Sequence, residues 1–218
     1  MRFLLTPANY DLADPVSIPN LLVQHLQIVS VSMLIALAVA LPLGWLVTRY
    51  PRLYVPVVTA AGLLYTIPGL ALLALLVPLT GLNASTIVIP LVLYAQLVLV
   101  RNTAAAINGI DPILLEVGRA MGMNRWQLLR RVTAPLALPL IIAGVRVATV
   151  TTIGIASLAS LVGAGGLGDL IFSSIQNANY DEVLGGGIVI AFVAVSFDFL
   201  LLGIQTILDR GRSATSVA

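Results

Sequence analysis

Five long apolar runs, separated by short polar stretches, make up most of this chain. They cover residues 26–48, 53–78, 84–104, 137–162 and 183–208. A helix of about 20 apolar residues crosses the hydrocarbon core of a membrane, which is about 30 Å thick. The pattern therefore predicts an all-α integral membrane protein with five transmembrane helices. Residues 168–178 could form a sixth helix, but it would be too short to cross and is expected to be re-entrant or to lie on the surface.

The composition supports a membrane location. Of the 218 residues, 59% are hydrophobic and 9% are charged, and the mean hydropathy is +1.05. Soluble domains carry roughly 25% charged residues, whereas residues 53–100 contain no Asp, Glu, Lys, Arg or His. The absence of cysteine excludes disulfides and thiolate-bound metals. We expect no metal site, and we expect the single histidine, His25, to lie at the membrane interface.

The eleven basic residues are all arginine, and their positions predict the orientation. With five spans, one side of the membrane receives Arg49, Arg52, Arg119, Arg125, Arg130, Arg131, Arg210 and Arg212. The other side receives Arg2 together with Asp11, Asp14, Asp169, Asp181 and Glu182. Because cytoplasmic loops are enriched in arginine and lysine, the N-terminus is predicted outside and the C-terminus in the cytoplasm. The expected divisions are an exposed extracytoplasmic lead-in (1–25), a transmembrane domain (26–210) and a cytoplasmic tail (211–218).

The only long polar interruption covers residues 111–139 and contains four of the eleven arginines. Asp111 followed by Pro112 is typical of a helix start, and Gly122 is expected to end or bend that helix. Asn124 and Gln127 form a capping-box pattern that opens a second short helix. Pro135 is expected to stop this second helix before the fourth span. Because the segment must lie in water, we expect it to face a soluble partner.

The spacing of three residues in this segment resembles the signature of binding-protein-dependent ABC importer permeases. Glu116-Val117-Gly118 takes the place of the family's E-A-A, Gly122 follows at the family's spacing, and Pro135 matches the proline near the end of the motif. Further stretches, at residues 66–78, 100–103, 136–150 and 163–171, are similar to the osmoprotectant subclass. That subclass imports glycine betaine, carnitine and choline. Permeases for methionine or another amino acid remain the alternative.

The resemblance implies a MetI-like transmembrane domain with the type I importer architecture. A coupling helix between the third and fourth spans (coupling segment 111–135) would contact a cytoplasmic ABC ATPase dimer. The contact residues would be Glu116, Arg119, Ala120, Met121, Gly122, Met123 and Pro135. The further partners would be a second permease subunit, identical or paralogous, and an extracytoplasmic solute-binding protein. The expected location is the bacterial plasma membrane, and no nucleic-acid partner is expected.

The chain itself is expected to be non-catalytic. It lacks G-x-x-x-x-G-K-[ST], so ATP and Mg²⁺ would be bound by the partner ATPase and this chain would need no cofactor. An intramembrane enzyme is disfavoured because the spans hold no Cys, no H-E-x-x-H and no paired carboxylates. A passive channel is disfavoured because neither a filter-like carbonyl motif nor a charge ring is present.

Two stretches are candidates for the translocation path or its gate. Tyr65, Pro68 and Gly69 lie within the second span, where proline frees a carbonyl and kinks a helix. Gly163, Gly165, Gly166 and Gly168 formally fit G-x-G-x-x-G, but no βαβ unit surrounds them, so a nucleotide site is rejected. The remaining interpretations of these glycines are a gate, or close helix packing without a gating role. Trp45, Tyr65 and Tyr94 could offer aromatic faces to a quaternary ammonium group.

Arg146 and Asp198 are the charges placed deep inside predicted spans. Each costs roughly 2.5–3.5 kcal/mol at the centre of a membrane helix on insertion scales, so neither is expected to face lipid. Both lie at a similar depth from the cytoplasmic surface. We therefore expect them to form a pair that joins the fourth span to the fifth. Direct contact of Asp198 with the solute is the alternative.

Overall fold

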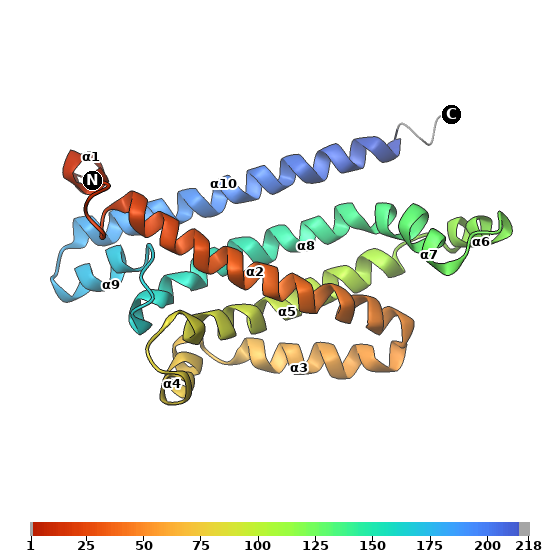
Figure 1. Ribbon diagram of the computed structural model, residues 1–218, viewed down its shortest axis with the longest axis horizontal. Helices are drawn as coiled ribbons and strands as arrows, with labels where there is room; N and C mark the ends of the chain where they lie inside the picture. Colours follow the sequence, from red (N-terminus) through yellow and green to blue (C-terminus); the bar gives the residue numbers. More distant parts are fainter. Residues whose placement is uncertain (1, 214–218) are drawn as a thin grey trace.

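The computed structural model describes residues 2–213, with side chains for residues 3–209. Helices make up most of this part of the chain, and it contains no strand. The helices long and apolar enough to cross a membrane are α2 (Ile18–Arg49), α5 (Ala84–Asn108), the run Arg125–Val162 that contains α8 (Ala134–Ile155), and α10 (Tyr180–Ser213). They extend along the long axis of the molecule (Figure 1). The prediction of an all-α membrane protein is confirmed.

Helix α5 forms the centre of the bundle and packs against both α2 and α8. Its Ile87, Leu91 and Leu99 are at most 1% exposed. Two glycines let the neighbouring helices approach it. A Cβ added at Gly44 of α2 would lie 2.5 Å from the Thr103 Cβ, and one added at Gly144 of α8 would collide with Asn102. Membrane helices commonly use small residues for such approaches, because packing rather than water drives their association.

The second span, predicted with a kink at its proline, is broken sharply there. The structure has α3 (Tyr54–Thr66) and α4 (Gly69–Thr80), which meet at an angle of 92°. Pro68 lacks an N–H, and a residue before proline is driven out of the helical conformation. Ile67 accordingly has φ −69° and ψ 124°. At 1.5 Å per residue α3 is only about 20 Å long. The described residues contain four membrane-length helices, or up to five spans if the bent pair counts as one.

The first membrane helix begins earlier than predicted. Helix α2 starts at Ile18, and Leu21 and His25 are 1% and 0% exposed. The exposed lead-in is therefore limited to about residues 5–16. At its start, α1 (Arg2–Leu5) lies beside the start of α10, where the Phe3 amide donates to the Asp181 carboxylate at 2.8 Å, and η1 (Pro7–Tyr10) within the lead-in contacts α2. A glycine-rich loop covers that part of α2 and buries His25, whose expected position at the membrane interface stays a prediction.

The ends of the molecule carry different elements (Figure 1). One end holds α1, α9 (Asp169–Gln176) and the loop before it, and the eight residues of α9 make it too short to cross, as expected. The opposite end, called the coupling end below, holds η2 (Pro51–Leu53), α6 (Pro112–Ala120) and α7 (Arg125–Leu128). Helix α10 also ends there, at Ser213. The boundary expected at residue 211 thus falls inside a helix, and residues 214–218 of the expected tail lie outside the described part.

Candidate functional site

Local hydrogen bonds shape the first half of the coupling segment. The Asp111 side chain caps α6 by accepting from the Ile113 amide at 2.9 Å. At the other end, Gly122 has φ +79°, a left-handed conformation that glycine adopts without strain. The Gly122 amide donates to the Arg119 carbonyl at 2.9 Å, and the Met123 amide donates to the Gly118 carbonyl at 3.1 Å. This pair of bonds is a Schellman motif, and it reverses the chain where a turn was predicted.

The second half differs from the prediction at Pro135. The capping box of Asn124 and Gln127 is present, and α7 begins directly after it. However, α7 leads through a π-helical turn, η3 (Leu129–Thr133), straight into α8, so Pro135 does not stop the helix. Proline is tolerated in a first helical turn, and the wider π turn before it accommodates the missing N–H. The coupling segment is therefore continuous with a membrane helix.

Gly118 joins the two halves into a compact hairpin. It is buried, and a Cβ added there would lie 2.6 Å from Leu128 Cδ1 and 3.5 Å from Met123 Sδ. Helix α6 can therefore lie directly on the helix that follows the turn. Gly118 was not among the residues predicted to contact the ATPase, although it occupies a small-residue position of the E-A-A motif. That motif position was the sequence signal that could have identified Gly118 as a packing residue.

The hairpin exposes both charged and apolar side chains. Glu116 and Arg119 are exposed, and no ion pair joins them in the described part of the chain. Met121 is 72% exposed and Val117 is 51% exposed. A groove of about 710 Å³ brings Met121 and Met123 together with Pro135. We call Glu116, Val117, Arg119, Ala120, Met121, Gly122, Met123 and Pro135 the coupling surface. Exposed apolar groups beside unpaired charges are suited to contact with another protein.

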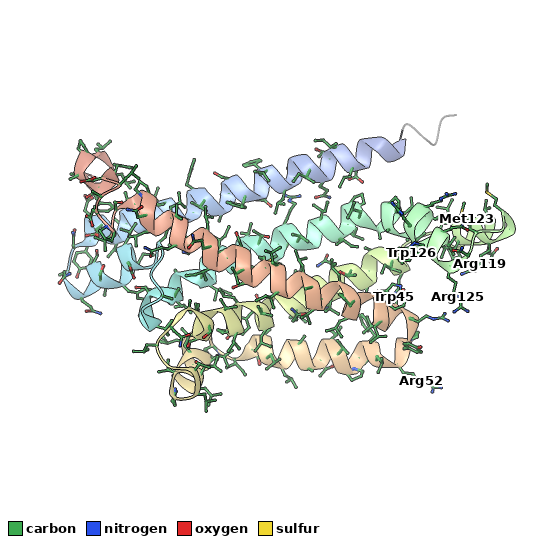
Figure 2. All side chains as sticks on the ribbon, viewed as in Figure 1. Trp45, Arg52, Arg119, Met123, Arg125 and Trp126 are labelled. Carbon is green, nitrogen blue, oxygen red and sulfur yellow. The ribbon has the colours of Figure 1, made fainter. Side chains whose placement is uncertain are left out.

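Figure 2 shows how the labelled side chains gather at the coupling end. Arg119, Met123, Arg125 and Trp126 belong to the hairpin, while Trp45 comes from the last turns of α2. Trp45 therefore lies apart from the tyrosines with which the sequence analysis grouped it. Trp126 is 67% exposed and was not identified as a candidate from the sequence.

The structure brings Arg146 and Asp198 together, as expected. The guanidinium donates from Nε to Asp198 Oδ1 at 3.0 Å and from Nη2 to Oδ2 at 2.9 Å. Nη1 also donates to Gln205 Oε1 at 2.9 Å. Such two-point contacts fix geometry as well as charge, so the pair joins α8 to α10. Gln205 was missed, although its position seven residues after Asp198 places it two turns along the same helix face.

Tyr65, Pro68 and Gly69 lie together at the break between α3 and α4. The carbonyl of Ile67, freed by the break, accepts a hydrogen bond from the Tyr94 hydroxyl of α5 at 2.7 Å. The Tyr65 and Tyr94 rings meet edge to face, with centroids 5.8 Å apart and planes at 73°. Helix α5 therefore holds the break in place, and Tyr65 remains 41% exposed beside it.

Replacing Tyr94 by Phe should destabilise this junction. The variant keeps the ring contact but leaves the Ile67 carbonyl unpaired, which should lower the free energy of unfolding by about 1 kcal/mol. Thermal unfolding in detergent measures this change. Tyr65→Phe is the matched control, because the Tyr65 hydroxyl makes no hydrogen bond within residues 2–213, and it should have no effect. Equal losses in both variants would contradict a bond of Tyr94 to the break.

The glycine-rich loop, residues 163–168, packs closely against two helices. The Gly166 amide donates to Gln24 Oε1 of α2 at 3.1 Å, and a Cβ added at Gly166 would lie 3.2 Å from His25 Nδ1. The His25 Nε2–H donates to the Ile153 carbonyl of α8 at 3.0 Å. Added Cβ atoms at Gly165 and Gly168 would collide with Gln24 and with the Ser157 backbone, while Gly163 faces open space. Close packing is thus present here, and a gating role stays a prediction.

Comparisons with known proteins show which proteins have a similar sequence. The profile of the family described as "Binding-protein-dependent transport system inner membrane component" matches residues 28–214. The chain is 40% identical over 205 residues to the osmoprotectant import permease protein OsmW of Salmonella typhimurium, which covers 92% of this chain and 95% of that protein. It is 41% identical over 185 residues to the carnitine transport permease protein OpuCB of Listeria monocytogenes, covering 84% and 85%.

Solved structures agree with these sequence relatives. The chain is similar to the MetNI methionine ABC transporter in an inward-facing conformation, with a TM-score of 0.75 and 25% identity. That similarity covers 85% of this chain and 93% of the other. The sequence relatives are thus closer than the methionine transporter, while the solved structure has the same fold over nearly its whole length.

Proposed function

The chain belongs to the family of inner membrane components of binding-protein-dependent transport systems, and on that premise we propose that it is the permease subunit of an ATP-driven importer of a small osmoprotectant. The solute would be glycine betaine, carnitine or choline. The observation that carries this choice is about 40% identity, over most of the chain, to permeases named for osmoprotectant and carnitine transport. Members of this family are multi-pass, non-catalytic subunits that work with a separate ATPase and a solute-binding protein.

The coupling surface is the proposed contact for the ATPase dimer. Its apolar side chains stay exposed at an end of the bundle that must lie in water, and its Glu116 and Arg119 have no ion-pair partner in the described residues. The Schellman turn at Gly122 and the packing of Gly118 keep the hairpin rigid. Because η3 continues into α8 without interruption, a displacement of the hairpin by the ATPase would move a membrane helix directly. Under this proposal the coupling end is cytoplasmic.

A second permease subunit, identical or paralogous, is proposed from the exposure of the membrane charge pair. The Asp198 side chain is 36% exposed, and Phe199 beside it is 66% exposed. A carboxylate in the middle of a membrane helix should not face lipid. This face of α10 is therefore proposed to be covered by the second subunit or to line the aqueous path between the two. One chain of this size leaves that face open.

The translocation path is proposed to pass the break between α3 and α4. Broken helices expose backbone carbonyls and often line transport pathways. Tyr65 offers an exposed aromatic face there, which suits the quaternary ammonium group shared by the proposed solutes. Gly163, Gly165, Gly166 and Gly168 are proposed to gate the path at the end of the molecule opposite the coupling end. The tight contacts of Gly165, Gly166 and Gly168 with α2 and with Ser157 leave no room for side chains at these three positions.

Solute uptake tests the function. The permease is reconstituted in liposomes with its ATPase and solute-binding protein, and uptake of labelled glycine betaine, carnitine, choline and methionine is measured with and without ATP. We expect ATP-dependent uptake of at least one of the first three and only background uptake of methionine. Uptake of methionine alone would instead support the amino-acid alternative, and uptake that does not depend on ATP would contradict an importer.

A further inference from the structure

A second groove lies at the coupling end and shares no lining residue with the groove at Met121 and Pro135. It measures about 780 Å³ and runs between the end of α2 and the helices α6 and α7. Its charged lining consists of Arg49, Arg119 and Arg125, with no carboxylate among the lining residues. No ion pair is recorded for any of these arginines in the described chain. The groove therefore concentrates uncompensated positive charge.

The rest of the lining is apolar and aromatic. Trp45 and Trp126, which are the two tryptophans of the sequence, both line the groove. Leucines of α6, α7 and η3 complete its floor. Figure 2 shows Trp45, Arg119, Arg125 and Trp126 gathered at this end, whereas Arg52 lies at the side of α3. A basic rim over an apolar floor matches an amphiphile, with an anionic group at the rim and hydrocarbon beneath it.

The position of the groove relative to the membrane favours a lipid. Helix α2 has 32 residues and is about 48 Å long, which exceeds a hydrocarbon core of about 30 Å. Its last turn, with Arg49, therefore reaches the headgroup layer, where tryptophan is also enriched. Basic pockets between membrane helices on the cytoplasmic side are suited to anionic headgroups. We propose that this groove binds the headgroup of an anionic phospholipid such as phosphatidylglycerol.

The proposal gives the groove a role different from that of the coupling surface, with which it shares Arg119 alone. A bound phosphate would bridge Arg49 of α2 to Arg125 of α7, and so would fasten the hairpin to the first membrane helix. An acidic surface of the ATPase is the competing occupant. The lipid is favoured because the groove begins on a membrane-spanning helix and because its floor is apolar. The inference depends on the membrane location of the chain and is independent of the solute that it carries.

Tryptophan fluorescence tests this directly, because both tryptophans report on the groove. The full-length permease is reconstituted in phosphatidylcholine nanodiscs that contain the same small fraction of either brominated phosphatidylglycerol or brominated phosphatidylcholine. We expect stronger quenching by the anionic lipid. Arg49→Gln and Arg125→Gln should each weaken this preference about fivefold, the effect of one basic residue near an anionic surface. The preference should persist when the ATPase is added.

Arg52→Gln is the matched control. It removes an arginine from the same end of the molecule but outside the groove, so it should leave the preference unchanged. Trp45→Phe leaves Trp126 as the sole reporter and should still show the preference. Equal quenching by the two lipids would overturn the proposal, as would equal effects of Arg52→Gln and Arg49→Gln. Loss of the lipid preference on adding the ATPase would assign the groove to that protein instead.

Discussion

Replacing Asp198 by Ala is expected to destabilise the permease by about 3 kcal/mol, the cost of an unpaired arginine at the centre of a membrane helix. The variant leaves the Arg146 guanidinium with only its bond to Gln205, inside a membrane-length helix. Insertion of an unpaired arginine at such a depth is unfavourable. Thermal unfolding in detergent and the amount of folded protein in the membrane both measure the loss.

A double variant separates charge from packing. Arg146→Met together with Asp198→Leu removes both charges and keeps apolar volume, and such replacements are often neutral or stabilising. We expect it to recover most of the stability lost in Asp198→Ala. Gln205→Ala should cost about 1 kcal/mol, the value of one hydrogen bond. If the double variant is as unstable as the single one, lost packing rather than an unpaired charge explains the effect.

The charge pair was predictable because so few charges lie deep within the spans. Two opposite charges at similar depth have little choice of partner in hydrocarbon, so Arg146 and Asp198 could be paired from the sequence alone. Gln205 was not found because a neutral amide gives no comparable signal. Its role depends on the rotation of α10 against α8, which is set by packing between helices.

The break in the second span shows that a run of apolar residues does not by itself determine how sharply a membrane helix bends. Several prolines lie inside membrane helices without breaking them, namely Pro42, Pro78, Pro90 and Pro139. Only at Pro68 do two helices of the described chain part at 92°. Pro68 differs from the other prolines because distant residues stabilise the break there. Tyr94 binds the freed Ile67 carbonyl, and Gly69 allows Leu158 to approach. Proline predicted a kink, but its size depended on residues from distant parts of the chain.

The coupling hairpin was largely predictable because its signals are local. The cap at Asp111, the turn at Gly122 and the capping box at Asn124 each depend on residues within a few positions. The helix end predicted at Pro135 was wrong because two local effects act there in opposite directions. A proline disfavours a continuing helix, yet the π turn before it lets α7 run on into α8. The groove beside Trp45 could not be predicted from local signals, since it joins segments more than 60 residues apart in the sequence.

Replacing Gly122 by Val is expected to disconnect ATP hydrolysis from transport. Gly122 has φ +79°, and no atom lies within 4 Å of an added Cβ, so the cost comes from the backbone and not from a collision. The left-handed conformation costs a residue with a Cβ about 1–2 kcal/mol, and a β-branched residue suffers most. The equilibrium constant for forming the native turn should fall about 5- to 30-fold, and ATP-driven uptake should fall by up to the same factor.

Gly122→Asn provides the control, because asparagine tolerates the left-handed conformation better than other residues with a side chain. It should retain most of the uptake, although it adds a larger side chain than a methyl group. Uptake in liposomes is measured together with capture of the ATPase, so that loss of assembly is distinguished from loss of transmission. Equal losses in the two variants would mean that size at this position matters, not backbone conformation. Full activity of Gly122→Val would show that the Schellman turn is not needed for coupling.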